Sequence, residues 1–170
     1  VNPQGLVETV ELLGSEEVTN GDFATDSDWT KSSGTTISEG VASIVVTSGG
    51  YQSMSQSLTY ISGKSYTLSV TVNGTSGKGC TFFDAGGNNG GLSTSNGIVT
   101  FNGAEQVIYI TFVANGNSNI ILVSRNGSGD YTFSIDNISV KESTKNNLAR
   151  VNYDGTASSL LVEPQRTNLI

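Results

Sequence analysis

Few side chains in this sequence could carry out catalytic chemistry. The chain has no histidine and one cysteine, Cys80. This composition excludes a nucleophile activated by histidine, a zinc site of the usual histidine and cysteine kind, and an intrachain disulfide. Cys80 begins the apolar run Cys80-Thr81-Phe82-Phe83. We therefore expect it to be a small core residue rather than a reactive thiol.

Carboxylates are the remaining candidates for acid–base chemistry. The 15 Asp and Glu residues would allow a glycosidase pair, which needs two acids facing each other across a cleft. Nothing in their spacing singles out such a pair. The glycine-rich stretch Gly86–Gly91 is not followed by Lys-Ser/Thr or by a helix, as a phosphate-binding loop would be. The sequence therefore predicts a protein that is not an enzyme.

Aromatic rings and planar polar groups offer a different chemistry, the recognition of sugars. A flat ring contacts the C–H face of a sugar, and amides, carboxylates and guanidinium groups bond its hydroxyls. We predict that such a ligand is bound by six residues near strand ends and turns: Tyr51, Gln52, Gln56, Asp84, Asn88 and Arg125. By contrast, we expect Trp29, Tyr66 and Tyr109 in the core, the two tyrosines because they lie in phase with aliphatic residues.

The charge of the chain excludes other classes of partner. The net charge is −7, with only 8 Lys and Arg residues, whereas a protein that binds nucleic acid needs a basic face. An anionic membrane surface is disfavoured for the same reason. No apolar run approaches the ~20 residues of a spanning helix, and no signal peptide is visible. Since the sequence begins with Val1 rather than Met, we expect it to be part of a longer protein.

The elements that would position these side chains are β-strands. Apolar spacing typical of helices is absent, and two-residue alternation recurs, most clearly over residues 65–72. Further strands are expected over residues 41–46, 51–58, 81–84, 98–101, 107–113, 120–123 and 131–140, separated by Asn- and Gly-rich turns. This pattern predicts an all-β, two-sheet β-sandwich with short extended flanking connectors. The Cys…Trp…Cys core of antibody domains is missing, which favours a jelly roll.

Two of these strands have unusual patterns. Residues 107–113 are apolar at both parities, which is typical of a central strand covered on both faces or of a strand at a subunit contact. In the last strand Tyr131, Phe133 and Ile135 share one parity, whereas Ile138 and Val140 take the other. A β-bulge at Asp136-Asn137 would keep all five side chains on one face. The alternative is a regular strand with both faces covered.

Three motifs in order carry a family resemblance. They are Val18-Thr19-Asn20-Gly21-Asp22-Phe23 with Asp28-Trp29, then Ile61-Ser62-Gly63-Lys64-Ser65-Tyr66-Thr67-Leu68, then Ile135-Asp136-Asn137-Ile138-Ser139-Val140-Lys141. Residues 10–142 thereby resemble carbohydrate-binding modules of the family 4/9/22 type. The resemblance implies a jelly roll that binds glycan without catalysis. It also implies a structural Ca²⁺ between the first and last strands, with Asp22 and Asp136 as ligands.

The two flanks, residues 1–9 and 143–170, are expected to be connectors. The run Leu160-Leu161-Val162-Glu163-Pro164-Gln165-Arg166-Thr167-Asn168-Leu169 resembles a connector of bacteriophage tail-fibre and other virion proteins. This resemblance implies a module on the virion surface that attaches to a host-surface polysaccharide or glycan, contacts other virion subunits and forms a homotrimer. A purely structural or decorating domain is the alternative. A secreted enzyme's accessory module is a third, against which the connector argues.

Overall fold

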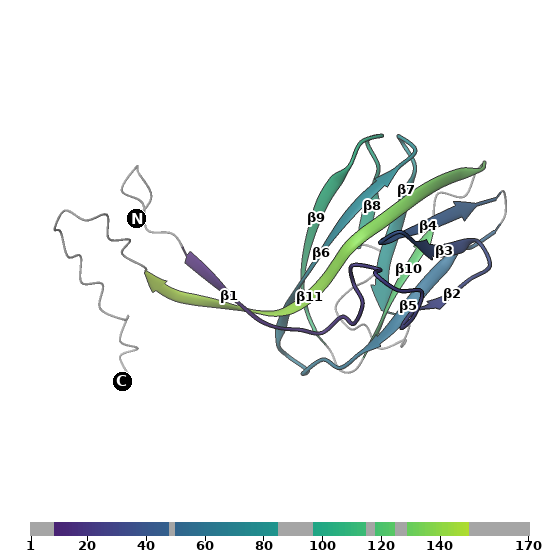
Figure 1. Cartoon of the computed structure of the whole chain (residues 1–170). Coiled ribbons are helices and arrows are strands. Elements are labelled where there is room, and N and C mark those ends of the chain that lie inside the picture. Colours follow the sequence, from purple (N-terminus) through teal and green to yellow (C-terminus); the bar gives the residue numbers. More distant parts are fainter. Residues whose placement is uncertain (1–8, 48–49, 85–96, 115–117, 125–128, 150–170) are drawn as a thin grey trace, which may run out of the picture. The chain divides into compact units, whose positions relative to one another are not determined.

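The computed structural model of the protein describes residues 9–47, 50–84, 97–114, 118–124 and 129–149. Every regular element in these ranges is a β-strand (Figure 1), and none is a helix that could span a membrane. The strands are β1 (Thr9–Glu16), β2 (Thr30–Lys31), β3 (Thr35–Ser38), β4 (Val41–Val46), β5 (Ser53–Leu58), β6 (Ser65–Gly74), β7 (Gly79–Asp84), β8 (Ile98–Thr100), β9 (Gln106–Val113), β10 (Ser118–Ser124) and β11 (Tyr131–Ala149).

These strands form two antiparallel sheets, which confirms the predicted sandwich. Sheet A has the order β3-β4-β11-β6-β9, and its sixth strand, β1, also pairs with β11. Sheet B has the order β2-β5-β10-β7-β8. Contacts between residues divide the chain into one compact unit, Ser15–Glu142, and a second unit made of Val1–Gly14 and Ser143–Ile170. All of the geometry discussed below lies within Ser15–Glu142.

The core forms between the inward faces of the two sheets, because two-residue alternation places one side-chain set of each strand there. Along β6 the residues Tyr66, Leu68, Val70 and Val72 are buried, and the serines and threonines between them are partly exposed. Each fully buried large apolar side chain contributes roughly 1.5–3 kcal/mol to the free energy of folding. The largest fully buried side chains are Tyr66, Phe23, Phe82, Phe101, Ile44, Met54, Leu68, Ile135, Val70 and Val72.

The last strand contains the predicted bulge. Asp136 pairs with Thr71, but the next pair across the same two strands is Ser139 with Ser69. One extra residue of β11 is therefore accommodated between these pairs, and Asn137 adopts the left-handed conformation there, with φ of 51°. As a result Ile135 and Ile138 are both buried, although their parities differ.

The core assignments for Cys80, Trp29 and Tyr66 are confirmed, since all three side chains are buried. The core assignment for Tyr109 is wrong, because 71% of this side chain is exposed. It lies on β9, which is the edge strand of sheet A rather than a central strand covered on both faces. The short strands β2 and β3 were not expected from the sequence. The connector at residues 160–169 lies outside the described residues.

Candidate functional site

The motif that opens the sandwich folds into a self-supporting loop. The side-chain amide of Asn20 donates to the carbonyl oxygens of Thr25 and Ser27, at 2.8 and 3.0 Å. The indole N–H of Trp29 donates to the Asn20 carbonyl oxygen at 3.1 Å. The buried ring of Phe23 packs against that of Trp29, with ring centroids 5.5 Å apart. These residues therefore have structural roles, and the Trp29 ring is not available to a ligand.

Gly21 places this loop directly against the last strand. Its carbonyl oxygen accepts a hydrogen bond from the amide of Ile138 at 2.9 Å. A Cβ atom on residue 21 would lie 2.0 Å from the Ile138 carbonyl oxygen, so only glycine allows this approach. The close contact brings the Asp22 end of the loop beside the bulge of β11. The sequence motifs at the two ends of the sandwich thus meet in the structure.

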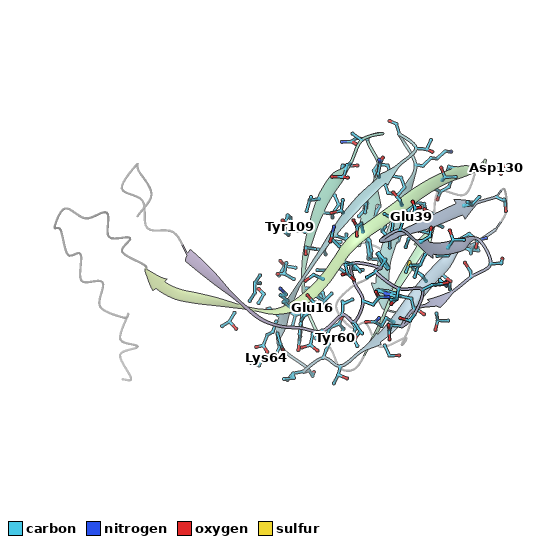
Figure 2. All side chains as sticks on the ribbon, viewed as in Figure 1. Glu16, Glu39, Tyr60, Lys64, Tyr109 and Asp130 are labelled. Atoms are coloured by element: carbon cyan, nitrogen blue, oxygen red, sulfur yellow. The ribbon has the colours of Figure 1, made fainter. Side chains whose placement is uncertain are left out.

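A depression of about 300 Å³ lies beside this contact and is lined by Glu16, Val18, Gly21, Asp22, Asn137, Ile138, Ser139 and Lys141. The Glu16 carboxylate (Figure 2) lies in this depression, and its hydrogen bonds tie the first segment to β11. One oxygen, Oε1, accepts from the amides of Val18 and Val140, at 3.0 and 2.8 Å. The other, Oε2, accepts from the Ser139 hydroxyl at 2.5 Å.

The two residues predicted as calcium ligands lie on the two segments that meet here. Asp22 lines the depression, and Asp136 directly precedes the left-handed Asn137, whose amide donates to Asp136 Oδ1 at 2.6 Å. No three Asp, Glu, Cys or His side chains gather into a metal-binding group among the described residues. Ca²⁺ takes 6–8 oxygen ligands, so backbone carbonyls and water would have to complete the shell of the two aspartates. Their role as calcium ligands stays a prediction.

The outward face of sheet B carries the exposed ring nearest to the predicted sugar site. Tyr51 is 75% exposed and lies two residues before Ser53, in phase with the outward residues of β5. Met54 and Leu58, at the opposite parity, are buried. The outward residues Ser53, Ser55 and Ser57 extend from the ring as a row of hydroxyls. A ring for C–H contact therefore adjoins hydroxyl donors and acceptors on one surface.

The two glutamines predicted as ligand-binding residues have partners within the chain. Gln52 Oε1 accepts from the Ser32 hydroxyl and the Gly34 amide, at 2.6 and 2.9 Å. Gln56 Oε1 accepts from the Thr19 amide at 2.8 Å, while its Nε2 donates to the Thr19 carbonyl oxygen at 2.9 Å. The same Nε2 donates to the Asp28 carbonyl oxygen at 3.0 Å. Both amides hold loops in place, so we assign them structural roles.

The other predicted sugar-binding residues are described only in part. The backbone of Asp84 ends β7 and pairs with Ile120 of β10, which in turn pairs with Gln56 of β5. The side chain of Asp84 lies outside the described residues, as do Asn88 and Arg125. Since Ser53 pairs with Val123, Tyr51 and the C-terminal end of β10 belong to the same end of sheet B. Their roles as ligand-binding residues stay predictions.

Sheet A carries a second exposed tyrosine on its outward face. Tyr109 projects from β9 (Figure 2) and pairs across the sheet with Ser69 of β6, which pairs in turn with Ser139 of β11. Its neighbours along the strand are the apolar Val107 and Val113, each 56% exposed, and the exposed Thr111. Sequence reasoning missed this ring because both parities of β9 are apolar, so alternation does not tell which set faces solvent.

Solved structures establish what this arrangement of sheets is similar to. The N-terminal cellulose-binding domain of Cellulomonas fimi β-1,4-glucanase C matches with a TM-score of 0.56 at 16% identity, over 75% of this chain and 95% of that domain. TmCBM61, solved in complex with β-1,4-galactotriose, matches with a TM-score of 0.58 at 15% identity, over 76% and 99% of the two chains. The fold is that of carbohydrate-binding modules. The second N-terminal cellulose-binding domain of the same glucanase matches with a TM-score of 0.54 at 18% identity, over 82% and 99%.

Comparisons by sequence give no closer relative. No protein-family model matches the chain, and no curated protein matches it. At identities this low the structural likeness establishes the fold alone, because one fold can carry many functions.

Proposed function

We propose that this chain is a non-catalytic module that binds a host-surface glycan through the outward face of sheet B. The exposed ring of Tyr51 is the observation that carries the proposal, because it adjoins the hydroxyl row of β5. A sugar ring stacked on Tyr51 would place its equatorial hydroxyls within reach of such groups. The similarity of the fold to cellulose-binding domains supports the same class of ligand.

The composition of the chain agrees with binding rather than catalysis. It offers no histidine for acid–base work, and its single thiol, Cys80, is buried in the core. Along the outward face of β5, the ring of Tyr51 is followed by the hydroxyls of Ser53, Ser55 and Ser57. These groups recognise a neutral sugar and do not hydrolyse it.

Binding can be tested with the whole chain and a matched pair of variants. A glycan array selects a ligand, and calorimetry with a soluble oligosaccharide of that type then gives the affinity of a single site. We expect Tyr51→Ala to lower this affinity at least tenfold and Tyr109→Ala to leave it unchanged, because Tyr109 lies on the other sheet. Equal losses in both variants, or no glycan bound by the wild-type protein, would contradict the proposal.

We further propose that the module belongs to a bacteriophage tail fibre or another virion fibre, where it forms a homotrimer with other copies and contacts other virion subunits. The resemblance of residues 160–169 to a virion connector supports this setting. Several linked copies would strengthen attachment, because a released site rebinds at high effective concentration. Immunogold labelling of intact particles with an antibody to the module tests the location. If the antibody labels the fibre but the module binds no glycan, the module would have the alternative, structural role.

A further inference from the structure

The edge strand β9 is unusual because nothing in the described part of the chain protects it. β9 pairs with β6 on one side and ends the order of sheet A on the other (Figure 1). Exposed edges invite pairing with another strand, and natural proteins usually block them with lysine, proline or a bulge. The sequence of β9, Gln-Val-Ile-Tyr-Ile-Thr-Phe-Val, contains neither a charged residue nor a proline. Its eight paired positions with β6 also run without a register shift.

The hydrogen bonds of the neighbouring residue show which backbone groups of β9 point to the free edge. Ala114 directs both of its groups toward the β6 side: its amide donates to the Lys64 carbonyl oxygen, and its own carbonyl oxygen accepts from the Gly63 amide, each at 2.8 Å. Backbone groups in an antiparallel strand alternate between its two sides. The odd-numbered residues of β9 therefore direct their N–H and C=O groups away from β6.

The same odd-numbered residues expose their side chains on the outward face of the sheet. Val107 and Val113 are each 56% exposed and Tyr109 is 71% exposed. Ile108 and Ile110, at the even positions, pack partly against the core. An incoming strand would thus find unpaired backbone groups and a row of apolar side chains at the same positions.

We propose that β9 pairs antiparallel with β9 of a second copy of this chain, across a two-fold axis that passes beside Ile110. This two-fold contact is separate from the three-fold assembly proposed for the fibre. In this register Val107 lies opposite Val113 of the second copy, and Tyr109 lies opposite its Thr111. On the inward face Ile108 lies opposite Phe112 of the second copy, and the two Ile110 residues lie opposite each other. Each free N–H and C=O of the odd-numbered residues then meets a free partner.

The sequence of β9 favours a second copy over a foreign strand because the strand complements itself. Aliphatic residues meet aliphatic or aromatic ones at every position of the proposed register except the Tyr109–Thr111 pairs, and an aromatic with a β-branched residue is a favourable cross-strand pair. If the register shifted by two residues in one direction, the aliphatic Val113 would lie opposite the charged Glu105. If it shifted in the other direction, Val107 would lie opposite the polar Asn115. The chain has a net charge of −7, so two copies repel each other least where neither presents a charge.

A pair of variants of the full chain, each with one added cysteine, tests the register. Even-numbered residues form the pairs without direct hydrogen bonds, whose Cα atoms lie about 4.5 Å apart, a spacing that a disulfide can bridge. We expect Ile110→Cys to form a covalent dimer under mild oxidation. Ile108→Cys, on the same face and with the same change of residue, is expected not to do so, because the two copies of residue 108 lie far apart. Wild-type protein, with only the buried Cys80, should stay uncrosslinked.

A second pair of variants measures the association without a crosslink. Thr111→Lys places a charge on the free edge, whereas Thr132→Lys places the same charge at an exposed position of β11 in the middle of sheet A. Sedimentation over a range of concentrations should show an association constant at least tenfold lower for Thr111→Lys than for Thr132→Lys. Equal crosslinking of the two cysteine variants, no crosslinking of either, or equal masses of the two lysine variants would overturn the proposal. The affinity of one glycan site for a soluble oligosaccharide does not depend on this pairing.

Discussion

The carbonyl oxygen of Gly21 accepts a hydrogen bond from the amide of Ile138, 2.9 Å away, and so joins the first loop of the sandwich to its last strand. The bond falls at the bulge of β11, where Asn137 has a positive φ and the pairing with β6 changes register. Two of the three sequence motifs that resemble carbohydrate-binding modules are therefore parts of one structural contact. Their spacing reflects the closure of the sandwich.

Substitution of Gly21 by alanine tests this closure. A Cβ atom would lie 2.0 Å from the Ile138 carbonyl oxygen, so the loop must move away and lose its contacts. We expect Gly21→Ala to lower the free energy of unfolding by about 2–4 kcal/mol. Gly50→Ala is the matched control, since its added carbon would meet nothing nearer than 3.4 Å. Urea unfolding curves that coincide for the two variants would contradict the expected role of Gly21.

The structural role of Gln56 predicts a specific loss of stability. Gln56→Glu keeps the oxygen that accepts from the Thr19 amide but replaces the Nε2 group that donates to the Thr19 and Asp28 carbonyls. A carboxylate oxygen would then face two carbonyl oxygens, at a cost of about 1–3 kcal/mol. Gln106→Glu adds the same charge but keeps the side-chain oxygen that accepts a hydrogen bond from the Asn102 amide. We expect thermal melting to show a lower midpoint for Gln56→Glu only.

Calcium, if it binds at Asp22 and Asp136, should stabilise the fold. A ligand that binds only the folded state raises the stability by mass action, so a chelator should lower the melting temperature and excess Ca²⁺ should restore it. Asp22→Asn and Asp136→Asn should each abolish this response. Asp26→Asn, a change in an exposed aspartate of the opening loop, should leave the response intact. A wild-type melting temperature that does not change with chelator would rule out a stabilising calcium ion.

The single thiol makes stability depend on pH in a defined direction. Burial raises the pKa of Cys80 far above its ordinary value, because a thiolate would lose its hydration in the core. The Cys80 thiol of the unfolded chain loses its proton above about pH 8.5, whereas the thiol of the folded chain keeps its proton. The free energy of unfolding is therefore not reduced by this ionisation below that pH. Above it, the free energy of unfolding falls by up to about 1.4 kcal/mol per pH unit.

Comparison with Cys80→Ala isolates this effect from other titrating groups. The difference in unfolding free energy between the wild type and the variant should be constant below about pH 8 and shrink as the pH rises further. In the same pH range a thiol reagent should label the wild-type protein only after denaturant is added. Rapid labelling of the native protein would show that Cys80 is accessible, contrary to its 1% exposure.

Sequence patterns predicted the features of the fold that depend on parity along one strand. The change of phase between Ile135 and Ile138 gave the bulge, because the side-chain period of a strand is two residues. The exposure of Tyr109 was predicted wrongly, since its strand is apolar at both parities and only the sheet order shows that it lies at an edge. β3 was not expected because its Thr-Thr-Ile-Ser sequence contains a single large apolar residue.

The candidate site was harder to predict because its contacts join distant parts of the chain. Gln56 resembled a ligand-binding residue in a polar strand, yet its partner Thr19 lies 37 residues away, and no local spacing indicates that contact. Tyr51 differs in this respect. Its position before a strand with alternating serines is a local feature, and the exposed ring found there agrees with the pattern.

The long strand β11 also has a mechanical consequence. It runs from Tyr131 to Ala149, with the bulge at Asn137, and is held on its two sides up to Glu142 by β4 and β6, both antiparallel to it. Ladder hydrogen bonds lie across the strand direction, so a force applied along β11 from its C-terminal end loads many of them together, in shear. Strands pulled apart sideways would instead lose their bonds one after another. The sandwich should therefore resist a pull along β11 better than a pull that peels β9 from the sheet edge.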